Sequence, residues 1–116
     1  SHTLEYAYSA WAVAQWAKQL SKTDEYNRLM DLSKGWERIY DSSCNFVRPK
    51  KKDGTFIEDF NPMQVWRGFQ EGNAWQYTFY VPHDAKGLVA KVGADVFNHR
   101  LDSIFTVSRR RFANLV

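Results

Sequence analysis

The residues with the clearest chemical potential lie together between Glu71 and Asp84. This stretch reads EGNAWQYTFYVPHD and holds two carboxyl groups, two side-chain amides, one histidine and four aromatic rings. Amides and acids form hydrogen bonds with hydroxyl groups, while aromatic rings cover the apolar faces of a sugar. A packed core does not need this mixture, whereas a site for a hydroxyl-rich ligand does.

Glu71 is the strongest candidate for a catalytic group. Trp66 and Trp75 flank it in the sequence, and Gly72 follows it directly. A carboxyl group among aromatic rings loses its water shell, which favours the protonated form that a general acid requires. The same spacing also fits a buried glutamate bonded to backbone amides or to an arginine. Spacing alone therefore leaves both interpretations open.

The other polar residues of this stretch have structural alternatives too. Asn73 and Gln76 could bond sugar hydroxyls or satisfy the loop backbone, and Trp75 could stack on a sugar or belong to the core. His83 and Asp84 could form a hydrogen-bonded pair. They are weak metal ligands without a third residue at suitable spacing. The simpler role for Asp84 is the N-cap of a following helix.

The composition excludes several classes of protein. The chain has 116 residues and a net charge of +3, which fits one small domain or part of a larger one. Its basic runs, Lys50–Lys52 and Arg109–Arg111, are short and accompany no nucleic-acid-binding motif, so we expect no nucleic-acid partner. Cys44 is the single cysteine, and no apolar run is long enough to span a membrane.

The elements that must position these residues are mainly helical. We expect a helix over 3–20 that is apolar nearly all round and therefore buried, followed by a one-sided helix over 24–40. Thr23 is the expected N-cap of the second helix. Glu5 would lie in the buried helix, where its charge needs a partner, and we favour a structural role for it. Two shorter helices are expected over 85–92 and 94–105.

The segment between the helical pairs should be irregular. Asp53-Gly54 between short apolar runs predicts a β-hairpin over 46–57, which Pro49 limits to a short ribbon. Glycines at positions 68 and 72 interrupt any helix before the active stretch. The prediction is therefore a helical hairpin at 3–40, a hairpin and loop at 41–70, the active-site stretch at 71–84 and helices at 85–106. This order suggests stacked helical hairpins with a small β-hairpin.

Motifs spread in order from residue 1 to about 106 resemble glycoside hydrolase family 92. They are SHTLEYAY at the start followed by Trp11, FVRP at 46–49, DG at 53–54, FNP at 60–62, EGNAWQYT at 71–78 and VPHD at 81–84. Each motif alone is weak, and the ordered set makes the resemblance specific.

The resemblance implies a calcium-dependent exo-acting α-mannosidase that inverts the anomeric centre of terminal α-mannosides on glycans. It implies an (α/α)6 barrel, of which this chain would supply stacked helical hairpins beside other segments of the same enzyme. It aligns Glu71 with the general acid and puts Asn73, Trp75, Gln76 and His83 in or near the active-site wall. It also implies a secreted or periplasmic location.

The resemblance leaves the supporting groups less defined. Glu5 and Asp84 would orient the active-site groups from behind, while the calcium ligands would lie largely outside this chain. Ala10 stands where the family often has an acid. The family's later motifs, Asn-Glu-Pro with a following histidine pair and a Gly-Asn-Asp-Asp-like stretch with the general base, do not occur in this sequence.

The absence of a candidate base in this sequence indicates that the chain is only part of a catalytic domain. An inverting glycosidase needs an acid and a base whose carboxyl groups lie about 6.5–9.5 Å apart. This chain offers a candidate acid and no convincing base, so we expect it to be one segment of a larger catalytic domain, inactive alone. Two alternatives stay open. One is a non-catalytic helical domain that binds carbohydrate or serves as a scaffold, and the other is a different helical-barrel enzyme, such as another glycosidase or a sugar epimerase.

Overall fold

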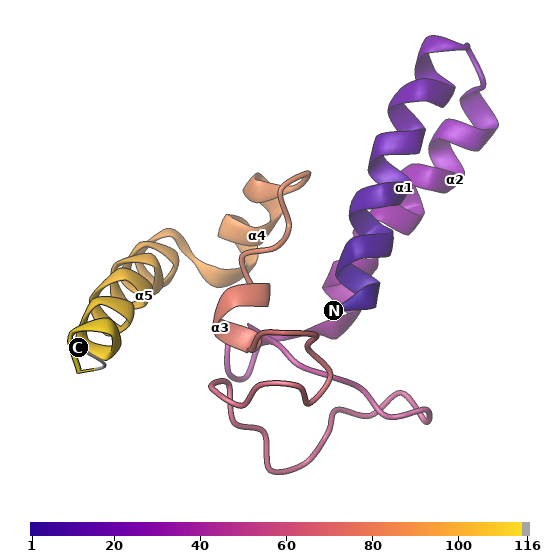
Figure 1. Ribbon diagram of the computed structural model, residues 1–116. Helices are drawn as coiled ribbons and strands as arrows, with labels where there is room; N and C mark the ends of the chain where they lie inside the picture. The colour runs from indigo at the N-terminus through magenta and orange to yellow at the C-terminus, as the bar shows by residue number, and fades with distance from the viewer. Residues whose placement is uncertain (115–116) are drawn as a thin grey trace. The chain divides into compact units, whose positions relative to one another are not determined.

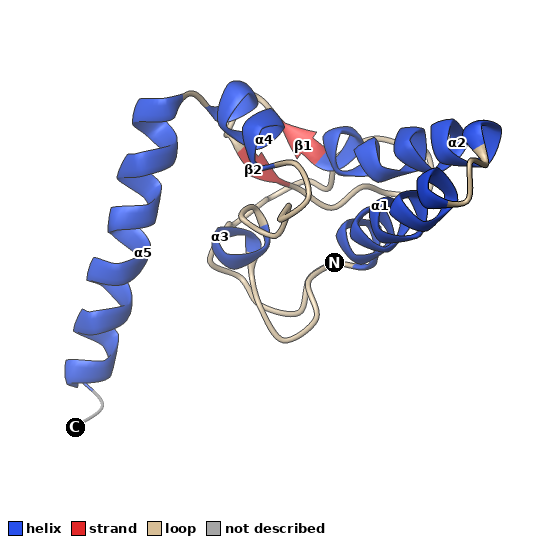
Figure 2. Ribbon diagram, turned by 90° about the horizontal axis from the view of Figure 1, so that it is seen from above, coloured by secondary structure: helices blue, strands red, loops and turns tan. Residues whose placement is uncertain are grey.

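A computed structural model describes the backbone over residues 1–114 and the side chains over residues 1–107 (Figure 1). The basic run Arg109–Arg111 therefore lies outside the described side chains. The chain divides into two compact units, Ser1–Asp84 and Ala85–Val116. The described residues are mainly helical with one small antiparallel sheet, as the sequence predicts (Figure 2). Over the same residues, no helix has the length and apolarity to cross a membrane.

The first unit begins with an antiparallel helical hairpin. It consists of α1 (His2–Gln19), α2 (Thr23–Ser33) and the 3₁₀ helix η1 (Lys34–Ile39). The two α-helices lie side by side in both views (Figures 1 and 2). One stripe of α1 is buried, formed by Leu4, Ala7, Ala14 and Ala17. Three of these four residues are alanines, whose small side chains let two helices approach closely.

The second predicted helix is shorter than expected. The α-helix ends at Ser33, and the chain continues to Ile39 as a 3₁₀ helix. Gly35 lies in this part, and glycine is a poor α-helix former. The predicted N-cap was also wrong, because Thr23 is the first helical residue and Lys22 occupies the cap position.

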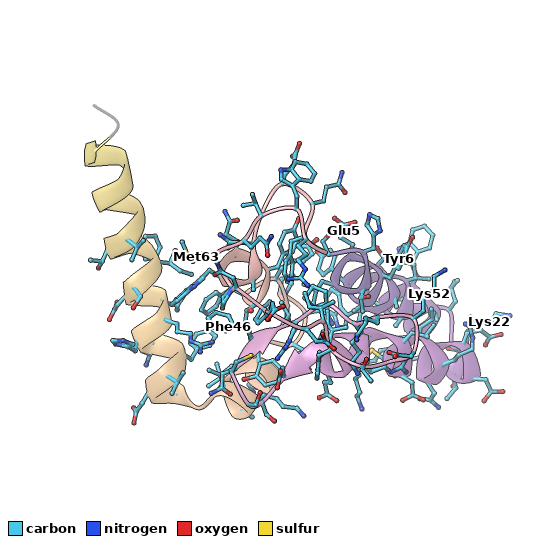
Figure 3. All side chains as sticks on the ribbon, turned by 90° about the horizontal axis from the view of Figure 1, so that it is seen from below. Glu5, Tyr6, Lys22, Phe46, Lys52 and Met63 are labelled. Atoms are coloured by element: carbon cyan, nitrogen blue, oxygen red, sulfur yellow. The ribbon has the colours of Figure 1, made fainter. Side chains whose placement is uncertain are left out.

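The prediction that α1 is buried all round is wrong for this chain. The side chains of Tyr6, Val13, Trp16 and Leu20 are exposed by 53–76%. Glu5 is also exposed, beside Tyr6 on the same helix (Figure 3). The described chain therefore covers one stripe of α1, and Glu5 is not the buried charge that the sequence predicts.

The two-stranded sheet lies nearer the N-terminus than predicted. Strand β1 (Tyr40–Asp41) pairs with β2 (Phe46–Val47), and Arg48 donates its backbone N–H to Ile39. The predicted hairpin around Gly54 is present as a short ribbon, in which Lys50 bridges Phe56 and the backbone N–H groups of Lys51 and Ile57 donate to the carbonyls of Thr55 and Pro49. Pro49 limits this ribbon as predicted, because a proline has no N–H to donate to the Ile57 carbonyl, which accepts the Arg48 guanidinium instead.

The interior of the first unit joins the irregular segment to the hairpin. The largest fully buried side chains are Trp36, Leu4, Val47, Val81 and Thr78. The Thr78 hydroxyl accepts the backbone N–H of Val47 at 3.0 Å and donates to the Ala74 carbonyl at 2.6 Å. The Trp36 indole N–H donates to the Asp84 carboxylate at 3.2 Å. These bonds connect the active stretch to the sheet and to η1.

The second unit contains two helices whose starting points match the prediction. These are α4 (Ala85–Val92) and α5 (Ala94–Asn114), separated by Gly93 with a φ of +89°. A left-handed glycine is a common way to end a helix. Helix α5 extends beyond the predicted end at Phe105, since no glycine or proline follows to stop it.

Candidate active site

The carboxyl group of Glu71 is presented by a tight loop. The backbone N–H of Trp66 donates to the carbonyl of Gly72 at 3.4 Å, which closes the loop between them. Both Trp66 and Glu71 have left-handed backbones, with φ of +67° and +55°. Non-glycine residues adopt this conformation rarely, and they concentrate at functional sites.

Gly72 is required by close packing rather than by its backbone angle. A Cβ atom at this position would lie 2.8 Å from Gln76 Oε1 and 2.8 Å from Tyr77 Cε2. Contacts this short do not occur for real Cβ atoms. The residue after Glu71 therefore has to be a glycine for the loop to rest against the following turn of helix.

The short helix α3 (Ala74–Tyr77) begins with a reciprocal capping box. Asn73 Oδ1 accepts the N–H of Gln76 at 3.2 Å, and Gln76 Oε1 accepts the N–H of Asn73 at 3.1 Å. The Asn73 amide also donates to the carbonyl of Met63 at 3.4 Å. Both amides thus perform the backbone role that was the simpler of the two predicted from the sequence, and substrate binding by them stays a prediction.

Glu71 itself is exposed. Among the described residues, none forms a hydrogen bond or ion pair with its carboxylate, so it is not the buried, partnered glutamate of the structural interpretation. It lines a pocket of about 260 Å³ with Gln76, Tyr77 and Tyr80. The predicted desolvation by surrounding rings is not present among the described residues, because Glu71 is exposed. Any further burial has to come from residues beyond those described.

Aromatic rings connect this pocket to helix α1. Phe69 stacks on Tyr77 with centroids 5.4 Å apart, and Tyr77 meets Tyr80 edge-on at 6.3 Å. Tyr80 lies 6.4 Å from Tyr8, which lies 6.0 Å from the ring of His83. The residue types do not show that Tyr8 and Tyr80 meet. Only the folded chain brings them together, since they lie 72 positions apart in the numbering.

His83 is held by the helical hairpin. Its Nε2 lies 2.8 Å from the carbonyl oxygen of Ser33, so Nε2 carries the hydrogen. In the neutral ring, Nδ1 is then a bare acceptor. This atom is buried and has no hydrogen-bond partner among the described residues. This geometry explains how His83 is oriented, and its contact with substrate stays a prediction.

Trp75 and Asp84 point to different neighbours from Glu71. Trp75 is half-buried and meets Phe46 edge-on with centroids 5.1 Å apart, which is a packing contact. Asp84 accepts the indole N–H of Trp36 and lies directly before α4. The structure thus brings Glu71 and Gln76 to one pocket, and it places Trp75 against the sheet.

The described residues offer no metal centre. Nowhere among them do three His, Cys, Asp or Glu side chains gather closely enough to hold a metal ion. The candidate site is a single carboxyl group in a pocket lined by one amide and two phenol groups. Such a group can donate a proton to an oxygen of a bound polyhydroxyl ligand.

The family profile for the glycosyl hydrolase family 92 catalytic domain matches residues 1–114. This chain belongs to glycoside hydrolase family 92. The membership confirms the resemblance of the ordered motifs, and it is consistent with a helical barrel. A comparison with curated proteins finds no match.

Solved structures of other family 92 enzymes are similar to this chain. A family 92 α-mannosidase of Bacteroides thetaiotaomicron is 35% identical with a TM-score of 0.85, over 89% of this chain and 14% of that one. The same mannosidase in complex with mannoimidazole is 33% identical with a TM-score of 0.85, over 89% of this chain and 15% of that one. A family 92 inverting mannosidase of Bacteroides thetaiotaomicron VPI-5482 is 31% identical with a TM-score of 0.84, over 87% of this chain and 14% of that one. The chain therefore spans about one seventh of the length of these relatives.

Proposed function

We propose that this family 92 chain is one segment of an inverting exo-α-mannosidase that hydrolyses terminal α-mannosides of glycans. Within it, Glu71 would be the general acid. The two relatives described as an α-mannosidase and an inverting mannosidase support the reaction class. Mannoimidazole bound to one of them supports a mannose-shaped ligand. The remaining segments of the same enzyme would complete the barrel.

The reaction divides between this chain and the rest of the enzyme. The Glu71 carboxyl gives its proton to the glycosidic oxygen as the bond from that oxygen to the anomeric carbon breaks. A water molecule attacks the opposite face of the same carbon and loses its proton to a base. The products are mannose of inverted configuration and the free alcohol of the leaving group. No described carboxyl other than Glu71 lines its pocket, so we assign the base to another segment.

The observation that carries this role is the presentation of Glu71. Its backbone is left-handed, its carboxylate has no partner among the described residues, and it faces a pocket lined by Gln76 and two tyrosines. A glutamate with a structural role would form a hydrogen bond or an ion pair through its carboxylate. A strained and unpartnered one is better explained by a bound ligand.

The replacement Glu71→Gln in the full-length enzyme tests the role. We expect kcat/KM to fall about 10²–10⁴-fold on a mannoside with a poor leaving group, because protonation assists that departure. Mannosyl fluoride needs little protonation, so its hydrolysis should change far less. Glu58→Gln is the matched control, since Glu58 is an exposed carboxyl of the same unit that pairs with Lys51. Near wild-type activity of Glu71→Gln on the poor leaving group would exclude Glu71 as the acid.

Calcium and location are separate parts of the proposal. The family resemblance implies calcium, and we expect its ligands to lie largely in other segments, since nowhere among the described residues do three His, Cys, Asp or Glu side chains gather. Removal of calcium by a chelator should abolish the activity of the full-length enzyme, and added calcium should restore it. The same resemblance suggests a secreted or periplasmic enzyme, which cell fractionation would test.

A second candidate is a carbohydrate-binding or scaffold domain without chemistry. The single carboxyl group of the pocket favours it, because hydrolysis with inversion needs two. A full-length protein that binds α-mannosides in calorimetry but releases no mannose would support this alternative. Release of β-mannose from an α-mannoside, followed by NMR, would exclude it.

A further inference from the structure

We propose that Trp66 is the stacking surface for the leaving-group sugar and so determines which glycosides the enzyme cleaves. This inference rests on the proposed role of Glu71 as the general acid. Trp66 is the most exposed ring of the segment between the helical hairpin and α3, with 63% of its surface accessible.

The backbone conformation of Trp66 is unusual for a residue with a side chain. A left-handed conformation costs an ordinary residue more than it costs glycine, so position 66 would favour glycine if the backbone alone mattered. A tryptophan is present instead, and its indole is not used to fill the core. The side chain therefore needs an explanation outside the packing of this chain.

The loop around Trp66 is firmly held, which is the second argument. A Cβ atom on Gly68 would lie 2.5 Å from Pro49, so the two residues are in close contact. The next residue, Phe69, is buried and stacks on Tyr77. A platform that stacks on a sugar gains most when it is ordered before binding, and this loop provides that order.

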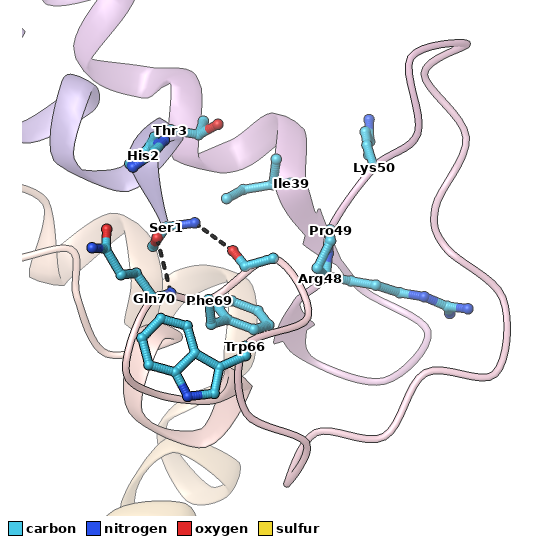
Figure 4. A pocket seen from close by; sticks show the side chains of 11 residues that line it. Ser1, His2, Thr3, Ile39, Arg48, Pro49, Lys50, Trp66, Phe69 and Gln70 are labelled. Atoms are coloured by element: carbon cyan, nitrogen blue, oxygen red, sulfur yellow. Dashed lines mark hydrogen bonds between the residues drawn. The ribbon is translucent and has the colours of Figure 1, made fainter.

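The pocket beside Trp66 has the chemistry of a sugar site. It has a volume of about 700 Å³, and its lining includes Trp66, Gln70, Thr3 and Lys50 (Figure 4). An indole covers the apolar face of a sugar ring, while amide, hydroxyl and ammonium groups reach its hydroxyls. Pockets for small ligands have volumes of about 300–1,000 Å³, so a sugar unit fits here.

The position of the two pockets relative to Glu71 is the third argument. Gln70 lines the pocket of Trp66, and the next residue, Glu71, lines the smaller pocket with Gln76 and Tyr80. A general acid protonates the oxygen that joins two sugars, so its carboxyl lies between their sites. The smaller pocket suits the single terminal mannose. The larger one suits the rest of the glycan, which varies in size.

The test compares two substrates in the full-length enzyme. An α-linked mannobiose has a sugar as its leaving group, and α-mannosyl fluoride has none. We expect Trp66→Ala to lower kcat/KM on mannobiose about 3–10-fold while leaving the value on the fluoride near wild type. Trp66→Phe should retain most of the activity on mannobiose. The ratio of the two kcat/KM values does not depend on how much of the variant is folded.

The matched control is Val65→Ala, which removes the neighbouring exposed apolar side chain. It should leave the ratio unchanged. The competing explanation is that another part of the longer enzyme covers the Trp66 indole, in which case Trp66→Ala lowers both activities equally. An unchanged ratio overturns the inference and leaves the role of Glu71 intact. A wild-type enzyme that cleaves neither substrate overturns the proposed function, and this inference with it.

Discussion

The helical hairpin of α1 and α2 and the irregular segment from Tyr40 to Asp84 achieve their shapes by different means. In the hairpin, a stripe of mostly small residues is buried along α1, so its stability is spread over many similar contacts. The irregular segment depends on single bonds and single close contacts, such as Thr78 to Val47 and Gly68 to Pro49. A single substitution should therefore lower the stability of the irregular segment far more than that of the hairpin.

Paired glycine substitutions provide the sharpest test. Gly68→Ala places a Cβ atom 2.5 Å from Pro49 at a φ of +85°, so both overlap and backbone strain oppose it. We expect the free energy of unfolding of the full-length enzyme to fall by about 3 kcal/mol. Gly35→Ala in η1 meets nothing within 4 Å and should stabilise by about 0.4–1 kcal/mol. Urea unfolding of both variants would measure the contrast, and equal effects would contradict it.

The same contrast explains which part of the fold could be predicted. The starting points of α4 and α5 and the hairpin of α1 and α2 follow from local patterns of apolar residues and breakers. The pairing of β1 with β2 does not, because the Asp53-Gly54 signal marks only the turn of the ribbon at 49–57, while Phe46 and Val47 pair with residues that precede them. The N–H of Val47 donates to the Thr78 hydroxyl, which lies 31 positions away, and no local pattern records such a contact.

A pair of buried hydroxyl groups gives the next largest expected effect. Thr78→Val leaves the buried N–H of Val47 without its acceptor, which should cost about 1–3 kcal/mol. Ser33→Ala in the hairpin removes a hydroxyl that donates to Met30 one turn earlier. That carbonyl keeps its place in the helix, so we expect a loss of about 0.5 kcal/mol. Thermal unfolding of the two variants measures both losses. Equal losses would contradict the expected difference between the irregular segment and the hairpin.

The candidate site was predictable in part for a related reason. Glu71, Gln76 and His83 could be picked out because their types are unusual for a core. The surroundings of these residues could not, since Tyr8 reaches His83 only through the fold, and Glu5 turned out exposed. The left-handed backbone of Trp66 and Glu71 also has no signature in the residue types, which are not glycine or asparagine.

The smallest expected effect concerns Asp41, at the start of the irregular segment. Burial alone would raise the pKa of Asp41, but hydrogen bonds from Ser43 and the ion pair with Arg48 outweigh it and hold that pKa below its ordinary value. The unfolded carboxyl binds a proton at higher pH than the folded one does. The contribution of Asp41 to stability is therefore complete above the unfolded pKa of about 4 and is lost as the pH falls through the folded value.

Unfolding of the full-length enzyme between pH 6 and pH 3, in urea, would detect this loss. The stability difference between wild type and Asp41→Asn should shrink as the pH falls, because protonated wild-type Asp41 no longer pairs with Arg48 as a charge. Asp31→Asn, which changes an exposed carboxyl of α2, should show no such trend. A constant difference for Asp41→Asn would mean that the Arg48 pair adds nothing to this end of the segment. The segment would then depend on its neutral bonds and close contacts alone.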